Sequence, residues 1–74
     1  MRVESKASGD GRDEYVVDAG DGRRAFLTVR RGSHPVQIES GLATGPTVAT
    51  SADQAAAVDE LGTWLVAEIL AGRA

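Results

Sequence analysis

The sequence predicts an α+β fold, in which a four-stranded antiparallel β-meander is followed by one C-terminal amphipathic helix packed on one face of the sheet. Short segments of alternating polarity fill the first half of the chain, and glycine-rich turns separate them. The last third instead repeats its apolar residues every three or four positions, which is the spacing of one helix face. We expect the 74 residues to form a single domain, because a chain of this length builds only one core.

Short connections join the predicted strands. The strands are expected at residues 2–7, 14–19, 24–30 and 35–40. The motif Gly-Asp-Gly-Arg occurs twice, at 9–12 and 20–23, and Asp-Gly is typical of tight turns because glycine accepts a positive φ. Connections this short favour antiparallel neighbours.

Alternation along the strands assigns their two faces. In the third strand, Ala25, Leu27 and Val29 point to one side, whereas Arg24, Phe26, Thr28 and Arg30 point to the other. The first set is expected to meet the helix, together with Val3, Val36, Ile38 and either Tyr15 with Val17 or Val16. One face of the sheet is therefore predicted to be apolar throughout.

A loop over residues 41–51 is expected to lead into a helix over residues 51–72, with a brief edge strand at 47–49 as an option. Ser51 and Gln54 have the spacing of a capping box, so Ser51 is the predicted N-cap. Asp53 adds negative charge to the first turn, where it suits the helix dipole.

The predicted helix is more apolar than one contact with a sheet requires. Its main stripe consists of Val58, Leu61, Leu65 and Ile69. Trp64 widens the apolar arc on one side, and Val66 and Leu70 widen it on the other. A wide arc favours a second partner, and a twofold dimer is the commonest one. We therefore expect a homodimer or partner interface that uses Trp64, Val66 and Leu70.

Composition limits the classes of function. The chain has no cysteine and one histidine, so we expect neither a disulfide nor a metal ion, and no cofactor motif is present. No apolar run approaches the ~20 residues that span a bilayer, which predicts a cytoplasmic protein without a membrane partner. Seven of the eight cationic residues are arginine, a bias that resembles small proteins of high-GC actinobacteria or their phages.

No pattern in the sequence predicts an enzyme. His34 lies between Ser33 and Pro35 in an expected turn, and sequence neighbours seldom face each other as nucleophile and base. Neither Gly-Asp-Gly motif has the glycine spacing of a dinucleotide or phosphate loop. We therefore expect a non-enzymatic domain without catalytic residues or a small-molecule substrate.

The polar side of the third strand is the best candidate contact surface. Arg24 and Arg30 flank Phe26 on this side, and Arg31 follows them in the chain. Single-stranded nucleic acid is commonly held in this way, by a stacked ring and by arginines that meet phosphates. Alternatively, Phe26 packs against a neighbouring strand or a dimer mate, and the arginine stems extend over it. The net charge of −3 opposes strong non-specific binding to nucleic acid.

Four strands followed by one helix resemble a PUR-domain repeat and, more loosely, the Whirly and transcriptional-coactivator types of single-stranded-DNA binder. The third strand, RAFLTVR at 24–30, and the helix segment LGTWL at 61–65 look like their counterparts in PUR repeats. The resemblance implies that Arg24, Phe26 and Arg30 contact nucleic acid and that the helix pairs two copies. Glu39 departs from the pattern, since a basic residue would help in the fourth strand.

Two functions follow from the sequence. The first is a homodimeric, non-enzymatic binding domain that acts through protein–protein interaction in a regulatory or accessory role. Acidic charge and surplus apolar helix surface both favour this function. The alternative is single-stranded nucleic-acid binding through Arg24, Phe26, Arg30 and Arg31.

Overall fold

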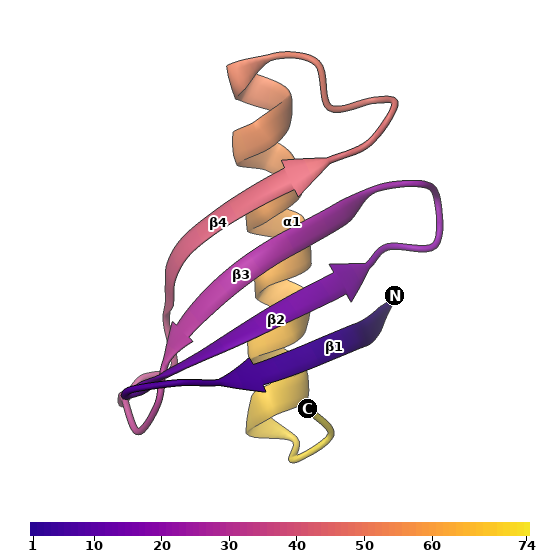
Figure 1. The fold of residues 1–74 in the computed structure, drawn as a ribbon. Helices are drawn as coiled ribbons and strands as arrows, with labels where there is room; N and C mark the ends of the chain where they lie inside the picture. The colour runs from indigo at the N-terminus through magenta and orange to yellow at the C-terminus, as the bar shows by residue number, and fades with distance from the viewer.

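Four antiparallel strands and one helix form two layers in the computed structural model, which describes residues 1–74. The elements are β1 (Arg2–Ser8), β2 (Arg12–Asp18), β3 (Arg24–Arg30), β4 (Ile38–Thr44) and α1 (Ser51–Leu70). The strands lie side by side in chain order, and α1 crosses one face of the sheet (Figure 1). The predicted α+β fold class is confirmed.

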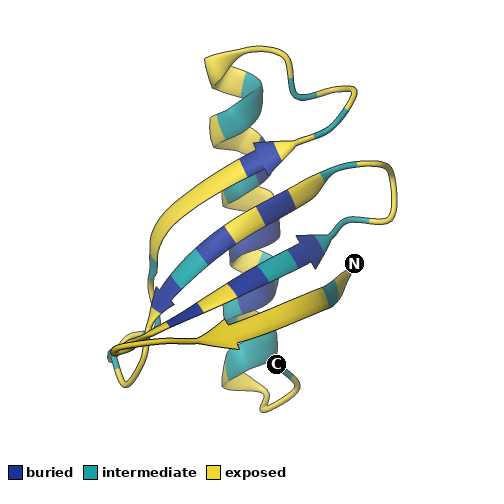
Figure 2. Cartoon of the chain, viewed as in Figure 1, coloured by how far each residue is buried: buried dark blue, intermediate teal, exposed yellow.

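The core lies between α1 and the inner face of the sheet, and buried and exposed positions alternate along β2 and β3 (Figure 2). The buried apolar side chains are Tyr15, Val17, Ala25, Leu27, Val29, Ala43, Ala57, Leu61 and Leu65. Tyr15 and Val17 point inward, so the alternative in which Val16 faces the helix is excluded. Val3, Val36 and Ile38 are partly buried against this cluster.

The fourth strand lies further along the chain than the sequence predicted. It covers Ile38–Thr44 instead of 35–40, so Gly41 belongs to the strand and the following loop is short. Residues 47–49 form no strand. Gly41 pairs with Leu27 on the inner face, where a Cβ atom would lie 2.7 Å from Val58 Cγ1. Gly41 was interpreted as a loop residue, but it lies within a strand. A glycine is needed there because the helix approaches the strand closely.

The start of α1 is capped by a different residue from the one predicted. Thr50, not Ser51, is the N-cap: its Oγ1 accepts a hydrogen bond from the Asp53 N–H at 3.1 Å. The Asp53 carboxylate accepts one from the Thr50 N–H at 3.1 Å, which completes the capping box. Hydrogen bonds with the Ala49 N–H, the Thr50 side chain and the Thr50 N–H lower the pKa of Asp53. The helix ends at Leu70, two residues before the predicted end.

This capping arrangement predicts different effects for two neighbouring hydroxyl residues. Thr50→Ala should lower the free energy of unfolding by about 1 kcal/mol, because the N–H of Asp53 loses its acceptor. Ser51→Ala should change it by less than about 0.5 kcal/mol. Urea denaturation followed by circular dichroism measures both. Equal losses for the two variants would contradict the assignment.

The structure contains no helix with the length and apolar character that crossing a membrane requires.

Candidate functional site

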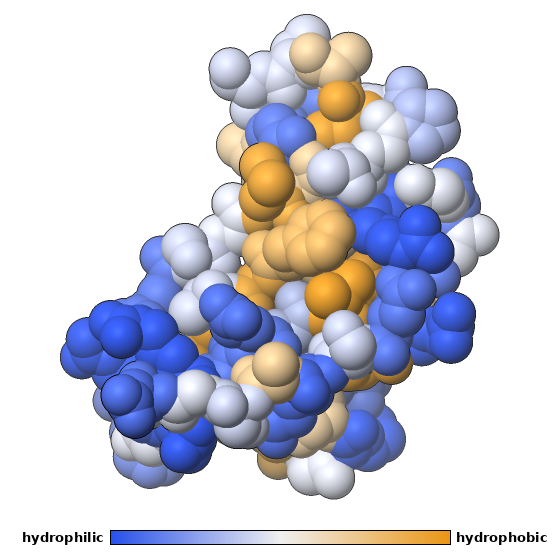
Figure 3. Space-filling view, viewed as in Figure 1, coloured by the Kyte–Doolittle hydropathy of each residue, from blue (hydrophilic) through white to orange (hydrophobic).

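The outer face of the sheet is open, since α1 covers only the opposite face (Figure 1). Three apolar residues lie next to one another across this face, because Val16 pairs with Phe26 and Phe26 pairs with Leu42. We call these three residues the apolar row. Phe26 is 45% exposed and Leu42 is 56% exposed. Figure 3 shows the resulting apolar band, with hydrophilic side chains on both sides of it.

Phe26 was predicted to lie on this face, but Leu42 was not. Residues 41–51 were expected to form a loop, so Leu42 was not assigned to a sheet face. Only the pairing of β4 with β3 places Leu42 beside Phe26.

Arg24 and Arg30 share the outer face with Phe26, but each already has a carboxylate partner. Arg24 Nε donates to Glu4 Oε2 at 2.7 Å, and this hydrogen bond raises the pKa of Arg24. Arg30 Nε lies 3.3 Å from Glu39 Oε1. Only the Nε atom of each arginine is engaged, but a phosphate at the remaining N–H groups would lie beside a carboxylate of the same charge. The geometry therefore weakens the case for a nucleic-acid surface.

Charges on the outer face balance. Register and ion pairs place on this face the four arginines Arg2, Arg12, Arg24 and Arg30 and the four carboxylates Glu4, Glu14, Asp18 and Glu39. The face is neutral, although the chain has a net charge of −3. It therefore lacks the positive potential that concentrates polyanions near a protein.

Arg31 connects the segment after β3 with the turn between β1 and β2, and it lies apart from the apolar row. Its Nη2 donates to the carbonyl oxygen of Gly9 at 2.7 Å and to Asp13 Oδ1 at 3.2 Å. A hydrogen bond with the Ser8 side chain is the main cause that lowers the pKa of Asp13, and Arg31 lowers it further. These contacts give Arg31 a structural role at the end of the sheet.

The three predicted interface residues of the helix have different surroundings. Trp64 is partly buried and packs against the core of its own subunit. Val66 lines a groove between α1 and β4, and Leu70 is 71% exposed. They form no common patch, because Trp64 and Val66 lie on opposite flanks of the helix.

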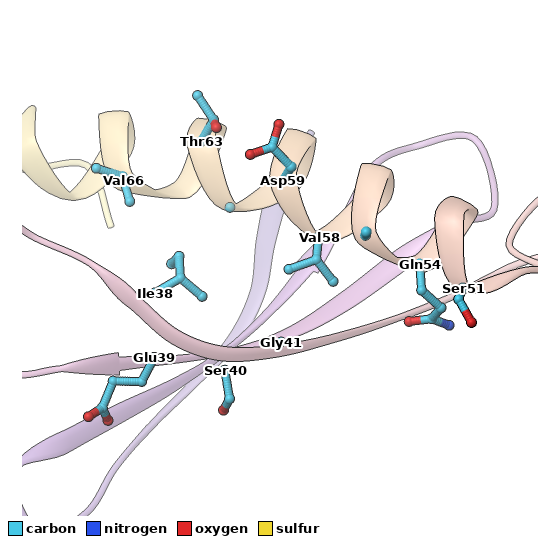
Figure 4. Close-up of a pocket in the computed structure, with 12 residues that line it drawn as sticks. Ile38, Glu39, Ser40, Gly41, Ser51, Gln54, Val58, Asp59, Thr63 and Val66 are labelled. Carbon is cyan, nitrogen blue, oxygen red and sulfur yellow. The ribbon is translucent and has the colours of Figure 1, made fainter.

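A groove of about 780 Å³ runs between β4 and α1. Figure 4 shows Ile38, Val58 and Val66 in the space between the two elements, whereas Glu39 and Ser40 point away from the helix. Gln54 closes one end of the groove, because its side-chain amide pairs with the backbone of Ala43. The Ala43 N–H donates to Gln54 Oε1 at 3.0 Å, and Gln54 Nε2 donates to the Ala43 carbonyl oxygen.

The titratable groups of the chain are spread over the surface. His34 is exposed in the connection between β3 and β4. No group of three or more His, Cys, Asp or Glu side chains is arranged to hold a metal ion. Comparisons of this chain with protein-family models, with curated proteins and with solved structures give no match.

Proposed function

We propose that this protein is a non-enzymatic protein-binding domain that forms a homodimer through the outer face of its sheet and serves a regulatory or accessory role. One observation carries the proposal: an exposed apolar row lies at the centre of an open face, and paired charges surround it. An apolar centre with a polar rim is the usual composition of a protein interface.

A second copy is the occupant that this face fits best. Each of its four arginines has a carboxylate of the same subunit within 3.6 Å, so a second copy of this face meets no net charge repulsion. Four strands of seven residues have a face of roughly 450 Å², from spacings of about 4.8 Å between strands and 3.4 Å per residue. Two copies contribute roughly 900 Å² in projection, close to the ~1,000 Å² of a specific interface.

The dimer can be tested by sedimentation equilibrium. The protein should sediment at high micromolar concentration with about twice the 7.7 kDa mass of one chain. Phe26→Ser and Leu42→Ser should each raise the dimer dissociation constant about 30-fold, because a central interface side chain contributes about 2 kcal/mol or more. Circular dichroism establishes that the variants remain folded.

Leu70→Ser is the matched control, because Leu70 is exposed but lies on the helix, away from this face. It should leave the dissociation constant unchanged. A monomeric wild-type protein, or a dimer that only the Leu70 variant dissociates, would overturn the proposal.

Nucleic-acid binding is the competing outcome, and the exposed ring of Phe26 between two arginines is the feature that favours it. A labelled single-stranded oligonucleotide titrated at two salt concentrations separates the two functions. We expect no binding that weakens with salt, since the outer face is neutral. Salt-dependent binding that Arg24→Ser abolishes would replace the dimer proposal with the nucleic-acid function.

A further inference from the structure

We propose that the groove between β4 and α1 binds an extended peptide segment of a partner protein, which adds to the free edge of β4 and places a lysine or arginine at Asp59. This surface is separate from the outer sheet face. The peptide site and the homodimer can therefore fail independently.

The backbone of β4 offers unused hydrogen-bonding groups at its outer edge. The Gln54 side chain on α1 forms hydrogen bonds with both the N–H and the C=O of Ala43. These two backbone groups therefore point away from β3. In an antiparallel pair, every second residue points its N–H and C=O to the same edge. The Gly41 N–H and C=O therefore also point away from β3, into the groove that Gly41 lines. The Gln54 amide occupies the position that a peptide group of an added strand would take.

The two edges of the sheet differ in how they are protected against an added strand. The β1 edge carries Arg2, Glu4 and Lys6 and has a bulge between Val3 and Ser5. Charged side chains and bulges are the common means of blocking strand addition. The β4 edge has its own irregularity near Glu39, but the segment 40–43 that follows is regular and uncharged. The β4 edge therefore accepts a short added strand at Gly41, between the irregularity near Glu39 and the Gln54 amide at Ala43.

The groove beside this edge provides space for apolar side chains. Val58 and Val66 of α1 form one wall, and Ile38 of β4 lies opposite them (Figure 4). Its volume of about 780 Å³ lies in the range of pockets that bind small ligands or several side chains. Side chains of a strand alternate between two faces, so every second side chain of an added strand would enter the groove. The bound segment should therefore carry apolar residues at alternate positions.

Charge selects a basic peptide over a second copy of this chain. Asp59 lies at the rim of the groove, where its exposed carboxylate is directed away from β4 (Figure 4) and has no ion-pair partner, and no lysine or arginine lines the groove. If β4 paired with β4 of a second copy, the Asp59 carboxylates of both copies would lie at the rim of the joined grooves, and no groove residue would supply a cation for them. A lysine or arginine in the peptide instead supplies the missing opposite charge.

The probe is a fluorescein-labelled peptide, Thr-Val-Thr-Lys-Thr-Val-Thr, whose second, fourth and sixth side chains lie on one face of a strand. Fluorescence anisotropy should show saturable binding to the wild-type protein below about 1 mM. A peptide with glutamate in place of lysine should bind at least tenfold more weakly. A peptide that is N-methylated at residues 2 to 6 keeps all its side chains but should lose at least tenfold, because it lacks the N–H groups that strand pairing needs in either direction.

Asp59→Lys should reverse the preference, so that the glutamate peptide binds more tightly than the lysine peptide. Asp10→Lys is the matched control: it changes the net charge equally, but Asp10 lies in the exposed turn between β1 and β2. It should retain the wild-type preference. Equal binding of the lysine and glutamate peptides, undiminished binding of the N-methylated peptide, or identical behaviour of the two variants would overturn the proposal.

Hydrogen exchange at the Gly41 amide tests the position of the peptide directly. The free protein should exchange this proton rapidly, and the lysine peptide should slow its exchange. Protection of Gly41 without peptide would show that a second copy occupies the edge, and unchanged exchange in the complex would place the peptide elsewhere; either result refutes the proposal. The Phe26→Ser variant should bind the peptide as tightly as the wild type, so loss of the dimer and loss of the peptide site are distinguishable.

Discussion

Leu61→Ala should lower the free energy of unfolding by about 2 to 5 kcal/mol, the largest effect we expect from a single substitution in this protein. The Leu61 side chain has no exposed surface and lies in the cluster between α1 and the sheet. Removal of its methyl groups loses burial and leaves a cavity that the two-layer core cannot close fully. The whole domain has only about 5 to 15 kcal/mol of stability, so the variant should unfold at a much lower urea concentration.

Leu70→Ala is the control for this prediction, because the same change is made in the same helix at a site that is 71% exposed. Its unfolding free energy should stay within about 0.5 kcal/mol of the wild-type value. Urea denaturation followed by circular dichroism measures both variants. A Leu61 variant as stable as the Leu70 variant would show that α1 does not pack on the sheet as described.

Gly41→Ala should destabilise the protein by about 1 to 3 kcal/mol, although alanine ordinarily stabilises a strand interior relative to glycine. The new Cβ atom would lie 2.7 Å from Val58 Cγ1 and 2.8 Å from Leu27 Cδ2, so α1 and β4 would have to separate. Thermal or urea unfolding gives the size of the loss. Its sign distinguishes a steric requirement for glycine from a purely local preference.

Two further variants test the cause of the Gly41 effect. Gly9→Ala is the control, since a Cβ atom at Gly9 would have no neighbour closer than 3.9 Å, and it should show no comparable loss. Val58→Ala removes one of the two clashing atoms. The double variant, Gly41→Ala with Val58→Ala, should therefore lose less unfolding free energy than the two single variants lose together. Strict additivity of the two changes would exclude the close approach as the cause.

Local patterns were sufficient to predict the architecture. Alternation in 24–30 correctly assigned Ala25, Leu27 and Val29 to the core, and the helical spacing correctly placed Leu61 and Leu65 there. Both patterns depend on which way consecutive side chains point, a property that each segment carries by itself. The short turns favoured a meander, and the structure shows the strands in that order.

The errors at β4 and at the helix cap have tertiary causes. Gly41 is a glycine because Val58 approaches it, and Val58 lies far along the chain. At the cap, Thr50 with Asp53 and Ser51 with Gln54 offer the same spacing one residue apart. The first pair forms the capping box, and Gln54 bonds the backbone of β4 instead. No local pattern in 50–54 indicates that Gln54 has this second partner.

The candidate site was predicted only in part, since its chemistry depends on pairing between strands. Arg24, Phe26 and Arg30 were identified from one strand alone. Their neutralisation by Glu4 and Glu39 requires the register of β3 against the rest of the sheet, which the sequence does not specify. The outer face was interpreted as a basic surface, but in the structure its positive and negative charges are equal in number.

The hydrogen bonds between Gln54 and Ala43 also shorten the strand edge at which identical chains could stack into fibres. Unprotected strand edges let identical chains stack without limit, and such growth needs a long uninterrupted run of backbone groups. Gln54 terminates that run at Ala43, and the irregularity near Glu39 interrupts it at the other end. Only the outward-pointing groups of Gly41 remain free between these two points, an edge too short for the repeated strand pairing that a fibre needs.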